Sequence, residues 1–369
     1  MLKLGFGMMR LPCTNSQLDI PQICSMVDYY IGQGFRWFDT AYFYHDGKSE
    51  SVISETIVKR HRREDFCVAT KLPLYCITEG KDALRIFNEQ CARTNLEYFD
   101  RYLLHAMDQK GFETSEKFGL WDFLRQQKAA GNVKKIGFSF HDSAEVLEKI
   151  LTAYPDVDFV QLQINYVDWD NAKIQSRLNY ETACRHNLDI IVMEPVKGGL
   201  LAGQLPKAAR NLLNEISSNY SPAEWALRFA GSLQHVVTVL SGMSDIGQIK
   251  TNTKLFSNFQ YLSEQETKAL HDAAKIMEQV KTIPCTGCSY CKEKCPIALS
   301  IPNLIKAWNN TLKFGLSSGA EQAFYRASSS GKPSDCIKCG ACETICPQHL
   351  PIRDTLKKLS ESFEGGKKK

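Results

Sequence analysis

The sequence contains no uninterrupted apolar run near the ~20 residues that a membrane-spanning helix requires, and residues 1–11 lack the long apolar stretch of a secretory signal peptide. It also lacks a strong charge of either sign, because 45 Lys and Arg face 41 Asp and Glu, a net charge of +4 in 369 residues. So small an excess gives no reason to expect nucleic acid or a membrane surface as a partner. We therefore expect a cytoplasmic protein that binds neither.

The one unusual feature of the composition is its 14 cysteines. Hydrophobic residues make up 43% and charged residues 23%, which is ordinary for a globular protein. At roughly 150 residues per domain, the length allows two or three domains, or one large barrel with an additional module. Because disulfides are rare in a reducing cytosol, so many cysteines indicate metal or redox chemistry.

Eight short apolar runs, rich in β-branched and aromatic residues, alternate with amphipathic stretches of helical length. The expected strands are Leu2–Gly7, Phe35–Asp39, Phe66–Lys71, Phe99–His105, Val133–Ser139, Phe159–Ile164, Ile190–Glu194 and Val236–Ser241. From the second strand to the fifth, successive strand ends lie 32 to 34 residues apart, the length of a βα unit. This pattern predicts a (β/α)8 TIM barrel. An open doubly wound sheet is the alternative, but no GxGxxG follows the first strand.

The chain is expected to divide into three parts: a barrel over 1–258, a linking helix over 259–281 and a C-terminal module over 282–369. Residues Ser263–Val280 have an amphipathic helical pattern that begins with a Ser263/Glu266 capping box. The module contains 13 basic and 7 acidic residues. Helical patterns at Ile301–Leu312 and Ala320–Ser328 predict that it is mostly α-helical.

Eight of the cysteines form two groups with identical spacing, CxxCxxCxxxCP. The first group is Cys285, Cys288, Cys291 and Cys295, and the second is Cys336, Cys339, Cys342 and Cys346. In such a motif the first three thiolates hold one iron–sulfur cluster and the fourth reaches the other cluster. We therefore expect two 4Fe-4S clusters, one held by Cys285, Cys288, Cys291 and Cys346, the other by Cys336, Cys339, Cys342 and Cys295.

Zinc is the alternative ligand, but zinc ribbons use paired CxxC knuckles and do not need the third and fourth cysteine of each group. The module resembles the two-cluster bacterial-type ferredoxins, and its 40 residues between Cys295 and Cys336 resemble the α-helical ferredoxin variant. Its excess of Lys and Arg would offset the negative charge of the clusters. The six scattered cysteines are expected to be small buried hydrophobes.

Ionisable residues at the carboxyl ends of barrel strands are the first candidates for catalysis. Asp39, Lys71 and His105 end the second, third and fourth expected strands, and Tyr44 follows Asp39 by five residues. Each alone has a structural explanation: a helix cap, a solvated charge, a core histidine and a packing tyrosine. Together, over residues 1–258, they resemble the Asp-Tyr-Lys-His tetrad of the aldo-keto reductase superfamily.

The resemblance implies an oxidoreductase that uses NADPH or NADH to reduce an aldehyde or ketone to an alcohol, here an iron–sulfur aldo/keto reductase in an anaerobic or low-oxygen cytoplasm. Tyr44 would donate a proton to the carbonyl oxygen. Lys71 would lower the pKa of Tyr44 toward working pH, since a nearby cation favours the phenolate. Asp39 would hold Lys71, and His105 would orient the substrate.

The same resemblance places Ser139 and Gln161 at the nicotinamide carboxamide, and Met193 where many members have an aromatic ring. Phe140 and His141 follow Ser139 where the family commonly has Asn. The segment that resembles the adenosine site holds Gly242, Met243, Gln248 and Asn252. Gly242 and Gln248 stand where the family commonly has the basic residues that bind the 2′-phosphate, which leaves the choice between NADPH and NADH open.

Hydride transfer moves two electrons and each cluster accepts one, and no flavin motif is present to couple them. The clusters could therefore exchange electrons with a ferredoxin or another redox partner, or serve the structure. In the runner-up hypothesis the protein carries electrons and its barrel is a docking scaffold for that partner. In a third hypothesis the cysteine module only stabilises the barrel.

Overall fold

The computed structural model describes residues 2–14, 17–203 and 205–365. By its internal contacts the chain forms two units, Met1–Pro195 with Leu227–Leu262, and Val196–Ala226 with Ser263–Lys369. The boundaries expected from the sequence, at 258 and 281, stay predictions. No helix in the described ranges is both long and apolar enough to cross a membrane.

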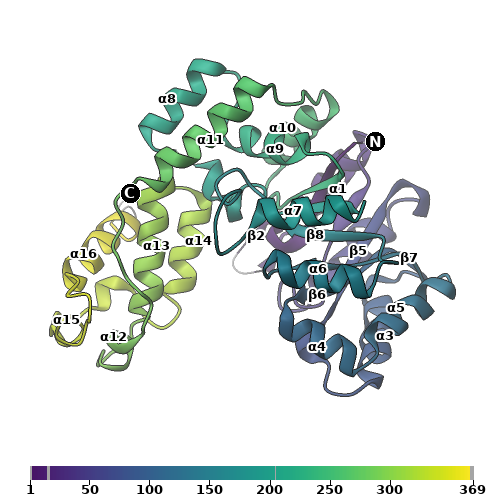
Figure 1. Cartoon of the computed structure of the whole chain (residues 1–369), viewed down its shortest axis with the longest axis horizontal. Coiled ribbons are helices and arrows are strands. Elements are labelled where there is room, and N and C mark those ends of the chain that lie inside the picture. The colour runs from purple at the N-terminus through teal and green to yellow at the C-terminus, as the bar shows by residue number, and fades with distance from the viewer. Residues whose placement is uncertain (1, 15–16, 204, 366–369) are drawn as a thin grey trace. The chain divides into compact units, whose positions relative to one another are not determined.

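In the first unit, eight parallel strands close into a barrel (Figure 1). They are β1 (Leu4–Gly7), β4 (Trp37–Asp39), β5 (Cys67–Pro73), β6 (Phe99–Met107), β7 (Val133–Phe140), β8 (Phe159–Gln163), β9 (Asp189–Met193) and β10 (Val236–Ser241). Because β1 pairs with both β4 and β10, the barrel has no open edge. The predicted (β/α)8 barrel is confirmed, the strand ends agree within two residues, and the open sheet is excluded.

Helices cover the outside of the strands, as Figure 1 shows for α3 to α6. They are α1 (Ile20–Gly32), α2 (Ser49–Ile53), α3 (Lys81–Thr94), α4 (Gln109–Lys117), α5 (Leu120–Ala129), α6 (Ala144–Ala153), α7 (Ser176–Arg185), α9 (Pro222–Ser232) and α10 (Ile246–Ser257). Several begin at side-chain caps that accept a backbone N–H, such as Asp19, Asp108 and Ser143. A short hairpin of β2 (Cys13–Thr14) and β3 (Gln17–Leu18) was not predicted.

One layer of apolar side chains fills the interior of the barrel. It consists of Ala69, Leu103, Phe159, Ile191 and Leu240. Because side chains alternate between the two faces of a strand, the residues two positions further along also point inward, now at the carboxyl-end mouth. These residues are Lys71, His105, Gln161 and Met193. The apolar layer is thus the floor of the site that the sequence indicated.

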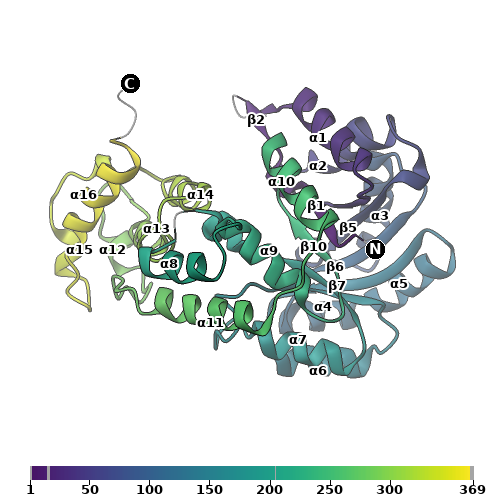
Figure 2. The same ribbon diagram turned by 90° about the horizontal axis from the view of Figure 1, so that it is seen from above.

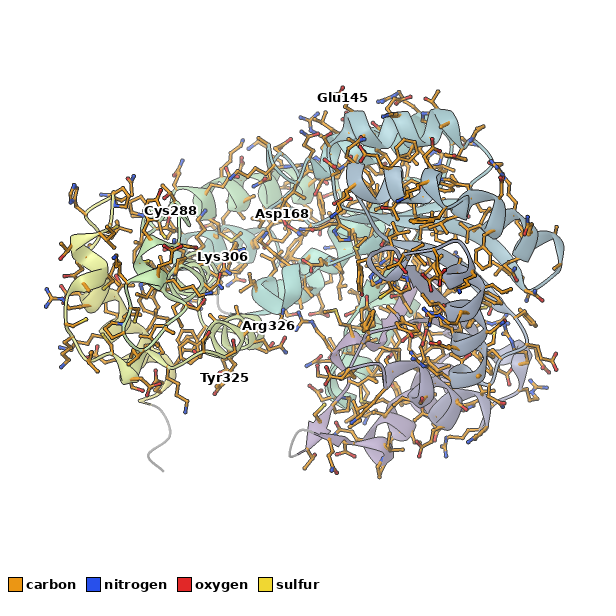
Figure 3. The ribbon with its side chains drawn as sticks, turned by 90° about the horizontal axis from the view of Figure 1, so that it is seen from below. Glu145, Asp168, Cys288, Lys306, Tyr325 and Arg326 are labelled. Carbon is orange, nitrogen blue, oxygen red and sulfur yellow. The ribbon has the colours of Figure 1, made fainter. Side chains whose placement is uncertain are left out.

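The regular elements described in the second unit are all helices. Its elements are η5 (Lys197–Ala202), α8 (Lys207–Ile216), α11 (Glu264–Glu278), α12 (Tyr290–Glu293), α13 (Ile301–Phe314), α14 (Ser318–Ala327), η6 (Pro333–Asp335), α15 (Ala341–Thr344) and α16 (Ile352–Phe363). α13 packs against α14 and α16 (Figure 2). On α14, Phe324 is buried, whereas Tyr325 and Arg326 are exposed, as Figure 3 shows for these last two. The predicted capping box at Ser263 is present. The predicted mostly α-helical module is confirmed.

Within this unit, the segment that follows β9 packs closely on the N-terminus of α14. Gly198 and Gly199 have left-handed φ values of 63° and 90°, which favour glycine. A Cβ atom on Gly319 would lie 2.6 Å from the carbonyl oxygen of Gly198 and from the backbone nitrogen of Leu200. Side chains larger than hydrogen would therefore separate the two segments.

Candidate active site and cysteine pockets

At the mouth of the barrel, Lys71 forms a buried ion pair with Asp39. The Lys71 Nζ donates a 2.6 Å hydrogen bond to Asp39 Oδ1 and a 2.7 Å hydrogen bond to the carbonyl oxygen of Thr40. Both side chains are almost fully buried, so the pair is poorly screened by water. Burial lowers the pKa of Lys71, but Asp39 and Tyr44 outweigh it and the net pKa is raised. Lys71 is therefore a fixed cation.

Tyr44 lies beside this cation. The Lys71 Nζ is 5.1 Å from the centroid of the Tyr44 ring, and the backbone N–H of Tyr44 donates to the carbonyl oxygen of Ala41. Burial raises the pKa of Tyr44, and Lys71 lowers it only part of the way back. Lys71 lowers the pKa of Tyr44, as expected, but desolvation of the phenolate exceeds the attraction of the ammonium, so the net pKa lies above its ordinary value and not nearer to working pH.

His105 completes the group. Its ring centroid is 6.2 Å from that of Tyr44, in an edge-to-face arrangement. Burial, followed by the charge of Lys71, lowers the pKa of His105 to about 3, so the imidazole is neutral at physiological pH. Within the described residues its Nδ1 atom has no hydrogen-bond partner. The structure thus brings all four predicted residues together, with a neutral imidazole facing a phenol.

The residues expected at the nicotinamide line the same mouth. Ser139 Oγ accepts a 2.8 Å hydrogen bond from the backbone N–H of Ala106. The Gln161 side-chain amide contacts Met193 Sδ at 3.5 Å, while Gln161 Oε1 is buried with no partner in the described part of the chain. An unpartnered buried acceptor is costly unless a ligand satisfies it. This atom fits the amide N–H of a bound nicotinamide.

The residues expected at the adenosine end are occupied by local contacts. Gln248 donates to Asp245 Oδ2 at 2.6 Å and accepts from the backbone of Ser244, and Asn252 donates to Ser241 Oγ at 3.2 Å. Met243 is fully buried.

The side chain of Arg10, which the sequence did not indicate as a site residue, packs against Gly242. A Cβ atom on Gly242 would lie 2.9 Å from Arg10 Cδ, and the Ser244 hydroxyl donates to the carbonyl oxygen of Arg10. Arg10 follows β1, which pairs with β10 on closure of the barrel. Pairing of the first strand with the last in a closed barrel is the feature from which the proximity of Arg10 to Gly242 could have been predicted.

The sequence analysis also did not predict a buried polar network around Glu50 and Gln90, which contacts the backbone of Lys71. Glu50 is fully buried and accepts hydrogen bonds from Thr70 Oγ1 at 2.7 Å and Gln90 Nε2 at 2.6 Å. The Gln90 amide also donates to the carbonyl oxygen of Lys71 at 3.1 Å, and the Tyr102 hydroxyl donates to Gln90 Oε1 at 2.6 Å. This network holds the backbone that carries Lys71.

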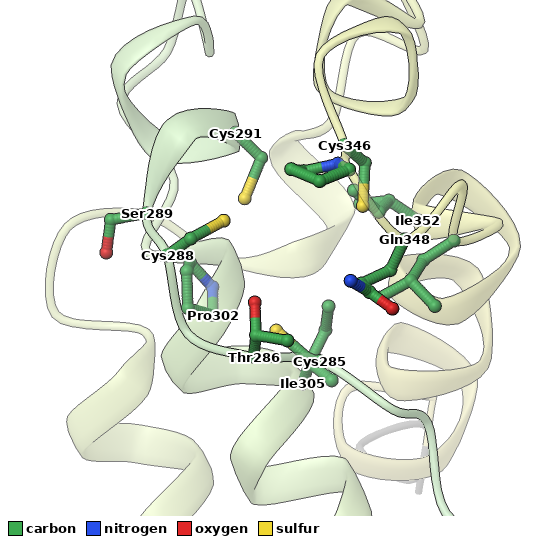
Figure 4. A pocket seen from close by; sticks show the side chains of 12 residues that line it. Cys285, Thr286, Cys288, Ser289, Cys291, Pro302, Ile305, Cys346, Gln348 and Ile352 are labelled. Atoms are coloured by element: carbon green, nitrogen blue, oxygen red, sulfur yellow. The ribbon is translucent and has the colours of Figure 1, made fainter.

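In the second unit, the eight cysteines of the repeated motif line two separate pockets. The first is lined by Cys285, Cys288, Cys291 and Cys346, whose sulfur atoms face its interior (Figure 4). The second is lined by Cys295, Cys336, Cys339 and Cys342. In each pocket the fourth cysteine comes from the other motif. Four thiols around one apolar hollow are the donor set of an iron–sulfur cluster, so the residues fit the group.

Two family models match the chain. The aldo/keto reductase family matches residues 3–275, and a 4Fe-4S dicluster domain matches residues 284–350, which include all eight motif cysteines. The second match favours iron–sulfur clusters over zinc.

Individual relatives agree with the first match. The chain is 23% identical over 299 residues to an uncharacterized oxidoreductase, YqkF, of Bacillus subtilis, covering 72% of this chain and 92% of the relative. An aldo-keto reductase from Bacillus halodurans, in its holo form, aligns with a TM-score of 0.57 and 21% identity over 73% of this chain and 91% of its own. An aldo-keto reductase from Klebsiella pneumoniae in complex with NADPH aligns with a TM-score of 0.56 and 20% identity, over 73% of this chain and 90% of its own. These solved structures share the fold of the barrel.

Proposed function

The chain belongs to the aldo/keto reductase family, and on that basis we propose that it reduces an aldehyde or ketone to an alcohol with NADPH or NADH at the mouth of its barrel. The observation that carries the proposal is the buried Lys71–Asp39 pair beside Tyr44, with the neutral imidazole of His105 facing the same phenol. A structural ion pair alone would not need a phenol and an unpartnered imidazole beside it.

Each of the four residues has a role that follows from its surroundings. A bound nicotinamide supplies a hydride to the carbonyl carbon. The Tyr44 hydroxyl donates its proton to the carbonyl oxygen, and Lys71 stabilises the phenolate that remains. Asp39 keeps Lys71 charged and in place. His105, neutral because of its low pKa, hydrogen-bonds the carbonyl oxygen and positions it near Tyr44.

The proposed cofactor contacts are Ser139, Gln161 and Met193 for the nicotinamide, and Gly242, Gln248 and Asn252 for the adenosine. The buried, unpartnered Gln161 Oε1 supports the first group. The aliphatic part of the Arg10 side chain lies against Gly242, which makes Arg10 the basic residue we propose for contact with the cofactor phosphates at this end.

The test is anaerobic purification with iron and sulfide quantified, followed by a carbonyl panel assayed with NADPH, NADH or reduced ferredoxin as donor. We expect nicotinamide oxidation that matches alcohol formation. If neither nicotinamide binds, and reduced ferredoxin nevertheless reduces the clusters, the enzyme proposal is lost and the electron-carrier hypothesis takes its place.

We propose that the two cysteine pockets hold one 4Fe-4S cluster each, with the crossed ligand sets seen in their linings. Crossed and uncrossed ligand sets predict different results when single cysteines are replaced. Cys346→Ser and Cys285→Ser should each lower iron from about eight to about four atoms per chain and leave the same EPR signal, because both would lose the same cluster. Cys295→Ser should remove the cluster of the second pocket and leave the EPR signal of the cluster in the first pocket.

The matched control is Cys184→Ser, which changes a half-buried cysteine outside the motifs and should leave the iron content unchanged. A Cys346→Ser protein whose remaining EPR signal equals that of Cys336→Ser would show that the ligands do not cross.

A further inference from the structure

Glu50 is a buried carboxylate that the proposed mechanism does not use. It lies on α2 with its side chain fully buried, where a charged carboxylate is costly unless hydrogen bonds or a cation compensate it. Burial raises the pKa of Glu50, and its hydrogen bonds lower it only part of the way back. Because a buried charge of this kind adds little to stability, a role for Glu50 must lie in what its contacts connect.

One oxygen of Glu50 is bound to the strand that carries Lys71. Glu50 Oε1 accepts a 2.7 Å hydrogen bond from Thr70 Oγ1, on the residue directly before Lys71, and a 2.6 Å hydrogen bond from Gln90 Nε2 on α3. The same Gln90 nitrogen donates to the carbonyl oxygen of Lys71 at 3.1 Å. These contacts fix β5 at the point from which the Lys71 side chain enters the mouth.

The other oxygen is bound to the segment that carries Tyr44. Glu50 Oε2 accepts a 3.3 Å hydrogen bond from Arg93 Nη1, which also donates to the carbonyl oxygen of Tyr42 at 3.4 Å. The Arg93 guanidinium carbon lies 4.1 Å from the centroid of the Tyr42 ring. Because Tyr42 precedes Tyr44 by two residues, Arg93 holds the segment on which the phenol stands.

Ser49, directly before Glu50, closes the same segment. Its backbone N–H donates to the carbonyl oxygen of Tyr44 at 3.1 Å, and its hydroxyl accepts a 2.8 Å hydrogen bond from Thr40 Oγ1. The carbonyl oxygen of Thr40 is in turn bound by Lys71 Nζ. The segment 40–49 is therefore fastened at both ends, and Glu50 follows at the point where it closes.

From these contacts we propose that Glu50 is a positioning residue for the proton transfer, because its two oxygens fix the segment of Tyr44 against the strand of Lys71. The proposal rests on the proposed function. Glu50 acts through the two groups that it holds and not on the substrate itself. A small displacement of the phenol from the ammonium would slow the reaction, since proton donation and stabilisation of the phenolate both depend steeply on geometry.

The test begins with Glu50→Gln, which keeps the size of the side chain and removes the charge that binds Arg93. It should lower kcat about tenfold and change the KM for the carbonyl and the Kd for the nicotinamide less than twofold. Adding Glu50→Gln to Tyr44→Phe should cause no further loss, because the phenol that Glu50 positions is already absent. A further tenfold loss in the double variant would overturn the proposal.

The matched control is Asp100→Asn, which removes the charge of another buried carboxylate, at the opposite end of the barrel. Asp100 accepts a 2.7 Å hydrogen bond from Arg63 and a 2.9 Å hydrogen bond from the backbone N–H of Val68, so it also joins an arginine to β5. This variant should lose stability as Glu50→Gln does but change kcat less than twofold. Equal losses of kcat in the two variants would show a general effect of losing a buried charge.

Fluorine NMR of protein labelled with fluorotyrosine gives a readout that needs no activity. The Tyr44 signal, assigned by its loss in Tyr44→Phe, should shift in Glu50→Gln and stay in place in Asp100→Asn. If Glu50→Gln does not fold, Arg93→Met breaks the same link from its more exposed side and should shift the signal too. An unmoved Tyr44 signal would overturn the positioning role, whereas a shifted signal in a protein that reduces no carbonyl would refute only the proposed function.

Discussion

Tyr44→Phe is expected to lower kcat for carbonyl reduction by about 10³-fold, within the range that a positioned general acid contributes. The variant keeps the ring beside Lys71 and His105 but removes the proton that the carbonyl oxygen must receive. Binding of the nicotinamide, measured by fluorescence titration, should be unchanged. Electron transfer from reduced ferredoxin to the clusters should also be unchanged.

The control for loss of a phenol is Tyr98→Phe. Tyr98 is half-buried and precedes β6, at the opposite end of the barrel, where its hydroxyl contacts Lys134. Its substitution should leave kcat within twofold. If Tyr44→Phe retained full activity, another group would have to be the acid.

The pKa directions at the mouth also predict the shape of the pH profile. Reduction needs protonated Tyr44, so the rate should fall as pH rises through the pKa of this residue, which burial raises above its ordinary value. The fall is therefore expected only at strongly alkaline pH. His105 should add no inflection near neutrality, because its pKa is about 3.

Lys71→Met is expected to cost about 3–5 kcal/mol of unfolding free energy, because it leaves the buried Asp39 carboxylate without its partner. Denaturant unfolding at pH 7.5 measures the loss. Without Lys71 the pKa of Asp39 should rise further, since burial already raises it and Lys71 is what lowers it. Protonation then removes the buried charge, so the cost should shrink as pH falls.

The matched control is Lys135→Met, which breaks a strand Lys–Asp pair that is substantially exposed. Lys135 and Asp189 are 2.8 Å apart with side chains 45% and 36% exposed. Such pairs contribute roughly 0–1 kcal/mol. Equal losses for the two variants would show that burial of the Lys71–Asp39 pair does not matter. In Lys71→Met the alkaline limb of residual activity should also move to higher pH, which a purely structural lysine would not cause.

The barrel and the four residues at its mouth could be predicted because strand period, strand ends and the motif are local properties of the chain. The direction of the Tyr44 pKa shift could not be predicted from the sequence, because desolvation depends on which residues cover a side chain in the fold. Arg10 was missed for a similar reason. Its neighbour Gly242 is distant in sequence, and only closure of the sheet between β1 and β10 brings the two together. The pocket linings agree with the crossed cysteine sets, because the spacing of the motif itself predicts that its fourth cysteine joins the first three cysteines of the other motif.

The contact of residues 196–203 with α14 has a consequence for any attempt to separate the two units by cutting the gene. The helical unit is discontinuous, since it includes a stretch that leaves the barrel sequence after β9 and returns before β10. A fragment starting at residue 282 would lack α8 and η5, and a barrel ending at residue 258 would leave both with their packing faces bare. Because the helical unit is built from two separate stretches of the chain, point substitutions will test its role with less disturbance of the fold than truncation.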